Sequence, residues 1–263
     1  MARQQQLLDA VLDGVQRVEE LATLLDVSPS TVRRGLADLE RQESVVRTHG
    51  GAVPARAAAE LSWPAKARRN VAAKRQIAKH AATLINDNHA RTVLLDAGST
   101  TTLIAEQIAQ NPALAGLTVI TNGIGPLQAC HENDDLEVVV LGGQLRRRRG
   151  SLVGDYTRLV LERLTVDIAF IGTDGLVPGR GLNCPSAELA AVKELHSRAA
   201  RHSVVVADSS KLGADAQLHW ALLNGPYTLI TDDGLTAADR RALATEPTCN
   251  PQIVPMDAAP SAD

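Results

Sequence analysis

The first fifty or so residues contain three short segments in which apolar side chains recur every three or four positions. The first covers residues 3–14 and ends at a glycine, which is a common C-terminal stop of a helix, and the second covers residues 18–25. In the third, Val32, Leu36 and Leu39 fall at positions i, i+4 and i+7. This spacing predicts three amphipathic helices, each with one buried face.

The third segment also carries the signals of a DNA-recognition helix. Ser28 is a good N-cap, and Pro29 suits the first helical position because its missing N–H has no helical acceptor there. The polar and basic side chains of this segment then lie near the exposed N-terminal turns, which are the turns that helix-turn-helix proteins insert into the major groove. The DNA contacts expected on this helix are Ser28, Ser30, Thr31, Arg33 and Arg34.

A β-hairpin is expected directly after the third helix. Residues 44–53 place β-branched residues on both sides of Gly50 and Gly51, a pattern typical of two short strands joined by a tight turn. Such a hairpin is the wing of a winged helix-turn-helix domain, which we assign to residues 1–57. Arg47 and His49 on the wing are expected to contact phosphate.

The remainder of the chain alternates short apolar runs with helical segments. An Ala-rich, Pro-containing stretch predicts a linker over residues 58–73, and an amphipathic helix from Lys74 to Ile85 opens a second domain over residues 74–254. Continuously apolar strands favour a largely parallel sheet covered on both faces. The fold class is therefore α/β, a winged helix-turn-helix followed by a doubly wound domain, with a flexible tail over residues 255–263. The strands are expected at Thr92–Asp96, Leu117–Thr121, Leu136–Leu141, Val166–Gly172, Ser203–Ala207 and Thr228–Thr231, and the helices at Thr101–Gln110, Gly125–His131, Tyr156–Leu164, Ser186–Ala200 and Thr236–Ala244.

Small and polar residues follow five of these strands, where open parallel sheets bind ligands. After the first strand, hydroxyl groups and the free N–H groups of a helix start would form a phosphate cradle. The cradle could instead be an ordinary capped helix that binds no ligand. Lys211 could likewise be an ordinary lysine in a solvated loop. The expected ligand contacts are Asp96, Gly98, Ser99, Thr100, Thr101, Asn122, Gly142, Gly143, Asp174 and Lys211.

Charge is distributed unevenly along the chain. The 263 residues have a formal net charge of −3, so nucleic-acid binding requires a local basic patch. Residues 29–75 supply one, with ten Lys and Arg against four acidic residues. Aromatic residues make up only 2%, which disfavours binding of nucleobases by aromatic stacking.

Other functional classes find little support. The three cysteines are widely spaced and the histidines show no metal-binding spacing, so neither a disulfide framework nor a metal is expected. Gly123 and Gly125 follow a strand, but Gln128 replaces the third small residue of a dinucleotide fingerprint, and we expect no cofactor. The run of four arginines at 146–149 is interpreted as a solvated or interface loop. No segment resembles a signal peptide or a membrane span, so a soluble, cytoplasmic protein is expected.

The order of these motifs resembles that of DeoR-type bacterial transcriptional regulators. The resemblance covers nearly the whole chain except the linker and the tail. It rests on Val18–Ala22, Thr31–Arg34, Leu36, Leu39–Glu40 and Arg47–Ala52 in the first domain, and on Lys74, Asp96–Thr101, Leu141–Gly143, Gly154, Asp167–Gly172, Glu188, Lys193, Asp208–Lys211 and Thr231–Asp232 in the second. One departure is Gly35, where family members commonly carry an aspartate.

The resemblance implies a homo-oligomeric repressor of a carbohydrate-utilisation operon, which is not an enzyme. Its partners would be double-stranded operator DNA and a phosphorylated sugar bound by an effector-binding sensor domain related to sugar-phosphate isomerases. Two other interpretations stay open. The chain could be such an isomerase with an accessory helical domain, using Asp96, Asp174 or Glu188 for acid–base chemistry. Alternatively, the first domain could bind another protein, although its basic patch disfavours this.

Overall fold

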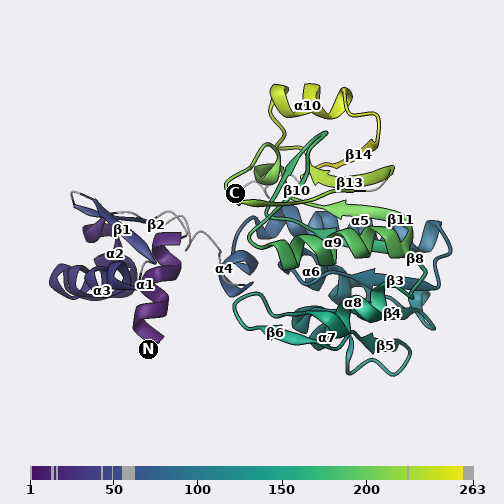
Figure 1. Cartoon of the computed structure of the whole chain (residues 1–263), viewed down its shortest axis with the longest axis horizontal. Coiled ribbons are helices and arrows are strands. Elements are labelled where there is room, and N and C mark those ends of the chain that lie inside the picture. Colours follow the sequence, from purple (N-terminus) through teal and green to yellow (C-terminus); the bar gives the residue numbers. More distant parts are fainter. Residues whose placement is uncertain are drawn as a thin grey trace, which may run out of the picture. The chain divides into compact units, whose positions relative to one another are not determined.

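The computed structural model describes residues 2–12, 15, 17–42, 44–48, 50–54, 63–223 and 225–256. The chain divides into two compact units, Met1–Lys66 and Ala67–Asp263 (Figure 1). Part of the expected linker is helical, because α4 covers Trp63–Ala67 and α5 begins at Val71. Residues 58–62 of that linker and residues 257–263 of the expected tail lie outside the described part.

The N-terminal unit is a winged helix-turn-helix. Val11, Leu21, Leu36 and Val45 are buried at its centre, so the three helices and the first strand share one core. The two strands pair antiparallel, with Thr48 opposite Gly51, as the sequence predicts. Its elements are α1 (Ala2–Leu12), α2 (Val18–Leu25), α3 (Pro29–Arg41), β1 (Val45–Thr48) and β2 (Gly51–Pro54).

A seven-stranded parallel sheet organises the second unit. The strand order is β14-β13-β11-β8-β3-β4-β5, and every neighbouring pair is parallel. The chain builds outward from β3 in one direction and from β8 in the other, so these two strands form the topological switch point of the sheet. The strands are β3 (Thr92–Leu95), β4 (Thr118–Thr121), β5 (Glu137–Val140), β8 (Val166–Gly172), β11 (Ala200–Val206), β13 (Tyr227–Asp232) and β14 (Cys249–Val254).

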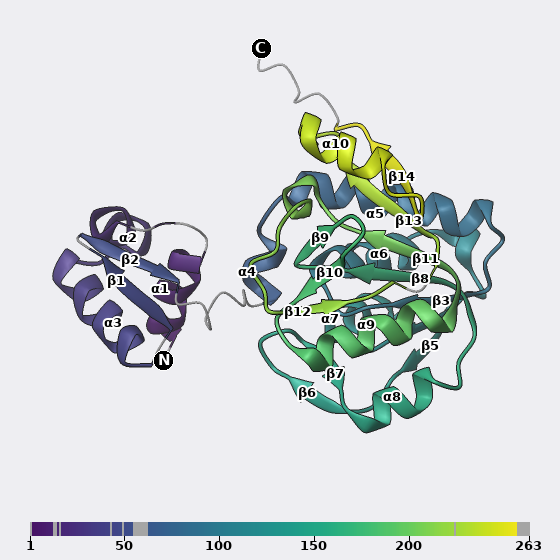
Figure 2. The ribbon, with the colours of Figure 1, turned by 45° about the horizontal axis from the view of Figure 1, so that its top comes forward.

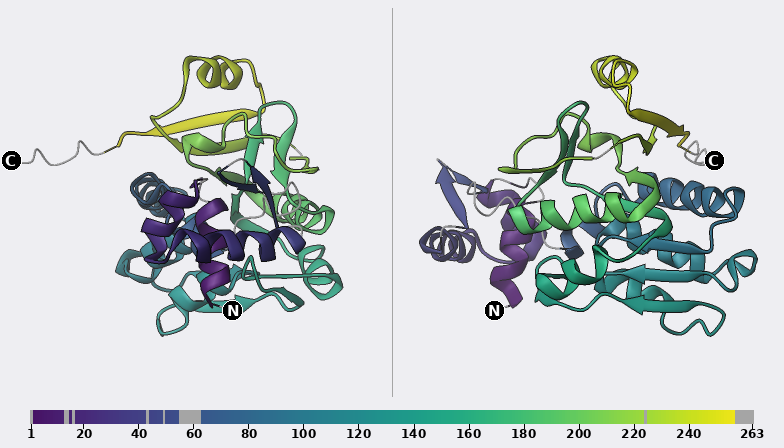
Figure 3. Two further views of the ribbon diagram at one scale, coloured as in Figure 1. Left: turned by 90° about the vertical axis from the view of Figure 1, so that its left-hand side faces the viewer. Right: turned by 45° about the vertical axis from the view of Figure 1, so that its right-hand side comes forward.

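Helices cover both faces of this sheet, as Figures 2 and 3 show for α9 on one of them. Successive strand residues point to opposite faces, and both cores are apolar: Val93 and Leu95 pack with one set of helices, and Leu94 packs with the other. This arrangement explains the continuously apolar strands. One face carries α5 (Val71–Asp87), α6 (Ser99–Ala109) and α7 (Ile124–Cys130), and the other carries α8 (Asp155–Leu161), α9 (Ala187–Ala199) and α10 (Ala237–Ala244).

Two small antiparallel sheets and the edge strand β14 were not predicted from the sequence. The first is a hairpin that carries part of the arginine run, and the second is a three-stranded sheet beside α9. Their strands are β6 (Gln144–Arg146) and β7 (Ser151–Val153), then β9 (Gly175–Val177), β10 (Gly181–Cys184) and β12 (His219–Ala221). Across the described part of the chain, every helix is too short or too polar to traverse a bilayer.

Candidate functional site

The start of α3 presents a set of hydroxyl groups to solvent. Ser28 caps the helix, since its Oγ accepts a hydrogen bond from the Thr31 N–H at 3.2 Å. The same Oγ lies 2.8 Å from the hydroxyl oxygens of both Ser30 and Thr31. All three residues are exposed, so these hydroxyls form a preorganised group at the N-terminal end of the helix.

The basic side chains beside these hydroxyls are also exposed. Arg33 lies 3.6 Å from the Glu19 carboxylate on α2, and Arg34 has no ion pair or hydrogen bond to any described residue. On the wing, the Arg47 guanidinium lies 3.9 Å from a carboxylate oxygen of Glu40. His49 lies outside the described residues. The N-terminal half of α3 therefore exposes hydroxyl and basic side chains together, and Arg33 is paired with Glu19.

Gly35 lies where α1 crosses α3. A Cβ at this position would stand 2.5 Å from Cδ2 of Leu7, so the missing side chain allows α1 to approach closely. An aspartate here would require Leu7 to move. The sequence feature that departs from the family pattern thus has a packing role in this unit.

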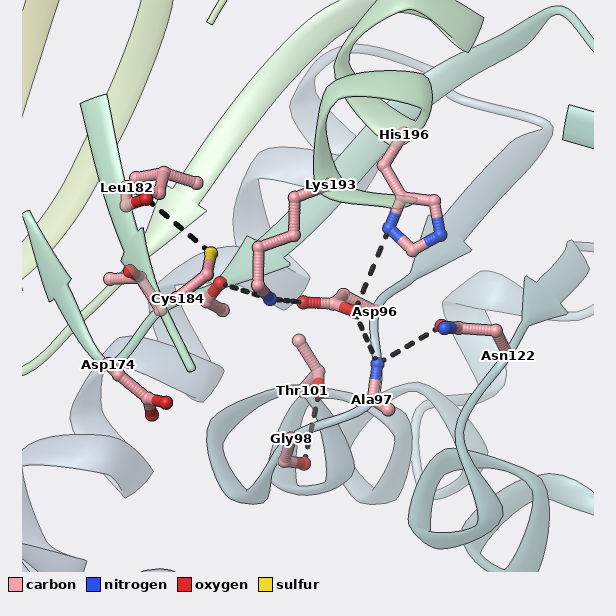
Figure 4. A network of polar contacts seen from close by, with 12 residues as sticks. Asp96, Ala97, Gly98, Thr101, Asn122, Asp174, Leu182, Cys184, Lys193 and His196 are labelled. Atoms are coloured by element: carbon pink, nitrogen blue, oxygen red, sulfur yellow. Dashed lines mark hydrogen bonds and ion pairs between the residues drawn. The ribbon is translucent and has the colours of Figure 1, made fainter. Parts of the chain in front are cut away.

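A buried ionic cluster occupies the switch point of the second unit (Figure 4). Asp96 follows β3 and is 2% exposed; it forms an ion pair with Lys193 on α9. The Lys193 ammonium also donates to the Gly172 carbonyl at 2.8 Å, at the end of β8. The pair therefore joins β3, β8 and α9 at the point where the strand order reverses.

His196 completes this cluster from the next turn of α9. Its Nδ1 lies 3.8 Å from an Asp96 carboxylate oxygen, and neither ring nitrogen has a hydrogen-bond partner. Burial lowers the pKa of His196 to about 4, the Asp96 charge opposes this shift, and Lys193 reinforces it. The imidazole is therefore neutral near pH 7.

This lowered pKa predicts an acid-sensitive fold. As pH falls from about 6.5 to about 4, the unfolded chain binds a proton that the folded chain does not, so the free energy of unfolding decreases by up to about 3 kcal/mol. His196→Leu removes this titration and should flatten that part of the pH profile, measured by urea unfolding. If the pH profile of His196→Leu matches that of the wild type, His196 is not the group responsible. His131→Leu, at an exposed position, is the control and should leave the profile unchanged.

The N-terminus of α6 offers hydrogen-bond donors beside the cluster. The hydroxyls of Ser99 and Thr100 have no hydrogen-bond partner among the described residues, whereas Thr101 donates to the Gly98 carbonyl at 3.0 Å. The first N–H groups of a helix likewise lack helical acceptors. Ser99 and Thr100, both largely buried, therefore supply the hydroxyls of the expected cradle that have no described partner.

Several of the predicted ligand-contact residues form hydrogen bonds or lie buried within the loops that follow the strands. The Asp96 carboxylate accepts from the Ala97 N–H at 2.8 Å, and the Asn122 side-chain oxygen accepts from the same group at 3.2 Å. Asn122 and Thr101 are fully buried. The geometry thus favours a supporting role for Asp96, Thr101 and Asn122, not direct contact with a ligand.

The arginine run at 146–149, expected to be a solvated or interface loop, is only partly exposed to solvent. Arg149 forms a two-bond ion pair with Asp174, and the exposed fractions of these side chains are only 12% and 13%. Arg146, on β6, lies 3.3 Å from a carboxylate oxygen of Glu188. Arg147 and Arg148 between them are exposed. The hairpin thus turns two of its four arginines inward, toward the ends of β8 and α9.

Lys211 lies in a second cation-rich group. It ends a 3₁₀ turn after β11, and burial together with Arg69 and Arg149 lowers its pKa, although Asp208 opposes the shift. Lys74 is buried nearby, and burial lowers its pKa to about 8. The Lys211 ammonium has no hydrogen bond or ion pair to any described residue, although the backbone N–H of Lys211 donates to the Asp208 carbonyl at 2.9 Å. An ammonium in this setting is suited to bind an anion.

The backbone at Gly142 and Gly143 follows β5. The Gly142 carbonyl accepts from the Thr157 hydroxyl at 2.6 Å. Gly143 has a φ of +148°, and a Cβ there would stand 2.4 Å from the Val153 carbonyl oxygen. Gly143 therefore lets the chain entering β6 lie close against Val153 at the end of β7, whereas a Cβ at Gly142 would meet nothing within 4 Å.

Sequence reasoning gave no site role to Arg149, Lys193, His196, Arg69 or Lys74. The i, i+3 spacing of Lys193 and His196 places both on the sheet-facing side of α9, which was the available signal. Nothing in the local sequence distinguishes Arg149 from its arginine neighbours.

Comparison with known proteins covers both units. Residues 3–57 match the family model described as DeoR-like helix-turn-helix domain, and residues 69–233 match the one described as DeoR C terminal sensor domain. The chain is 35% identical over 244 residues to the HTH-type transcriptional regulator GlpR of Haloferax volcanii, covering 92% of this chain and 93% of that one.

Two further proteins extend the comparison. The chain is 32% identical over 235 residues to the HTH-type transcriptional repressor GlcR of Bacillus subtilis strain 168, covering 87% of this chain and 88% of that one. Among solved structures, ribose 5 phosphate isomerase A from Neisseria gonorrhoeae aligns over 54% of this chain and 53% of its own, with a TM-score of 0.39 and 15% identity.

Proposed function

Since the chain belongs to the DeoR family of transcriptional regulators, we propose that it represses a carbohydrate-utilisation operon and that a phosphorylated sugar controls its binding to the operator. The N-terminal unit is the DNA-binding part. In the proposal, Arg33 and Arg34 contact bases or phosphates, Ser28, Ser30 and Thr31 contact the backbone or base edges, and Arg47 and His49 contact phosphate. The GlcR relative is described as a transcriptional repressor, which supports repression over activation.

The observation that carries the sensing part is the set of unpartnered donors around the switch point. Ser99, Thr100 and the first N–H groups of α6 suit a phosphate, and Lys211 adds a positive charge that no described residue neutralises by direct contact. Gly98, Gly142 and Gly143 would let the ligand approach the backbone. In the proposal, Asp174, which pairs with Arg149, accepts hydrogen bonds from sugar hydroxyls.

A thermal-shift screen against aldose and ketose phosphates tests this site. A ligand at about 100 times its Kd stabilises the folded state by about 2.7 kcal/mol, which raises the melting temperature of the sensor unit. Lys211→Ala should abolish the shift given by the phosphorylated sugar, because the variant lacks the unpartnered ammonium. Lys79→Ala, at an exposed position on α5, is the matched control and should keep the shift.

The rise in melting temperature given by the phosphorylated sugar should also depend on pH. Lys74 has its pKa lowered to about 8, so raising the pH through this value removes positive charge near Lys211 and weakens anion binding.

If no phosphorylated sugar shifts the melting temperature, or if Lys211→Ala responds as the wild type does, the proposed site is wrong.

An isomerase activity is disfavoured by the state of the candidate carboxylates. Asp96, Asp174 and Glu188 each form an ion pair with a lysine or arginine, so none is placed as a free general base. The curated relatives named above are transcriptional regulators. Efficient interconversion of an aldose phosphate and a ketose phosphate by the purified chain would reverse this conclusion.

A further inference from the structure

Helix α8 has two apolar faces, although only one of them packs on the sheet. Thr157 and Leu161 point inward and are buried. On the opposite side, Tyr156, Leu159 and Val160 are 74%, 47% and 38% exposed. A helix that covers a sheet normally has a polar solvent side, so this exposed apolar face indicates a contact with another molecule.

Charged residues mark the two ends of this exposed face. Asp155, in the first turn, has a 93% exposed side chain and lies 3.4 Å from the Arg158 guanidinium of its own helix. Arg163, just beyond the last turn, has a 66% exposed side chain and lies 3.9 Å from the Glu162 carboxylate. Asp155, Leu159 and Arg163 are spaced four residues apart, so they lie in one row along the helix. The row runs from negative through apolar to positive.

We propose that this α8 face, made of Asp155, Tyr156, Leu159, Val160 and Arg163, is the contact between two copies of the chain. A two-fold axis at Leu159 sets the two α8 helices antiparallel and brings Leu159 against its own counterpart. Asp155 of each copy then lies opposite Arg163 of the other. A parallel arrangement of the two helices would instead set like charges opposite each other. An isologous contact requires a surface that is complementary to a second copy of itself, and the antiparallel arrangement meets this requirement.

Neighbouring residues extend the apolar surface. β5 is an edge strand of the large sheet, and its Val139, which pairs with Ile120 of the core that includes α8, is 37% exposed. Leu145 on β6 is 44% exposed. Figures 1 and 2 both place α8, β5 and β6 at the same end of the unit. A stable dimer buries about 800 Å² on each partner, more than a two-turn helix supplies alone, so we include these residues in the contact.

The contact has a consequence for DNA binding. A two-fold dimer carries two recognition helices, which matches the paired half-sites that helix-turn-helix dimers bind. The inference does not depend on the nature of the effector, and its failure would leave the proposed sugar-phosphate site intact.

Charge reversal tests the contact in the full-length protein, with molar mass measured by light scattering after size exclusion. D155R places two arginines opposite each other, and R163D places two aspartates opposite each other, so each variant should dissociate at least about ten times more readily than the wild type. The double variant D155R/R163D restores opposite charges and should recover the wild-type mass. Both positions are exposed, so the variants are expected to fold, which circular dichroism verifies.

A second pair of variants tests whether loss of the dimer depends on the α8 face or follows from placing a charge at any exposed leucine. Leu159→Glu should give a monomer, whereas Leu218→Glu, at an 84% exposed leucine before β12, should leave the mass unchanged. A monomeric wild type, or a dimer that persists in D155R, R163D and Leu159→Glu, would overturn the proposal. Failure of the double variant to recover the dimer would overturn the antiparallel arrangement.

Discussion

Replacing both Arg33 and Arg34 by alanine is expected to weaken operator binding by about two to four orders of magnitude. Each arginine contact to a base or phosphate contributes about 1–3 kcal/mol, and both side chains are exposed near the N-terminal end of α3. Fluorescence anisotropy with the gene's own upstream DNA measures the loss. The dependence of affinity on salt should also become shallower, by about one unit of slope for each phosphate contact removed.

Arg41→Ala is the matched control for this variant. Arg41 lies in the last turn of the same helix and forms an ion pair with Asp38, so the substitution removes one positive charge, half of what the double variant removes, about two turns from the proposed contact surface. Its affinity for DNA should stay within a few-fold of the wild type. An equal loss of binding free energy per charge removed in the control and in the double variant would mean that only net charge matters and that α3 does not read the operator.

The second large effect is expected at the Asp96–Lys193 pair. Lys193→Met leaves the buried Asp96 carboxylate without its cation, and removing one partner of a buried ion pair costs about 3–5 kcal/mol. Urea unfolding should show this loss of stability.

Two comparisons establish that the pair causes this loss. The double variant D96N/K193M has no buried charge at either position and should recover part of the lost stability. Lys79→Met, at an exposed lysine on α5, should change the free energy of unfolding by less than about 0.5 kcal/mol. If Lys193→Met is as stable as Lys79→Met, the pair does not hold the switch point together.

Elements specified by local signals were predicted well from the sequence. The Ser28 cap, the buried row of Val32, Leu36 and Leu39, and the wing beside Gly50 each depend on residues a few positions apart. The alternation of apolar strands and helices likewise predicts the doubly wound sheet. In these cases, the periodicity of the chain and its capping residues determine the structure directly.

Features that depend on distant partners could not be predicted in the same way. β14 contains Pro251 and polar residues, which argue against a strand until its place at the sheet edge is known. Arg149 is identical in type to three neighbours, and only the fold brings it to Asp174. Lys193 joins Asp96 across 97 positions of sequence. Such pairings are tertiary, so the sequence supplies candidate residues but not their contacts.

We propose that an anion held near Lys211 controls the affinity of α3 for DNA. The most direct measurement is the affinity of the intact protein for its upstream DNA, by anisotropy, with and without the phosphorylated sugar that stabilises it. We expect the sugar to change the wild-type affinity for DNA at least about tenfold, and we expect Lys211→Ala to bind DNA normally but not to respond to the sugar. Equal affinities with and without a sugar that demonstrably binds the wild type would show that the bound sugar does not control DNA binding.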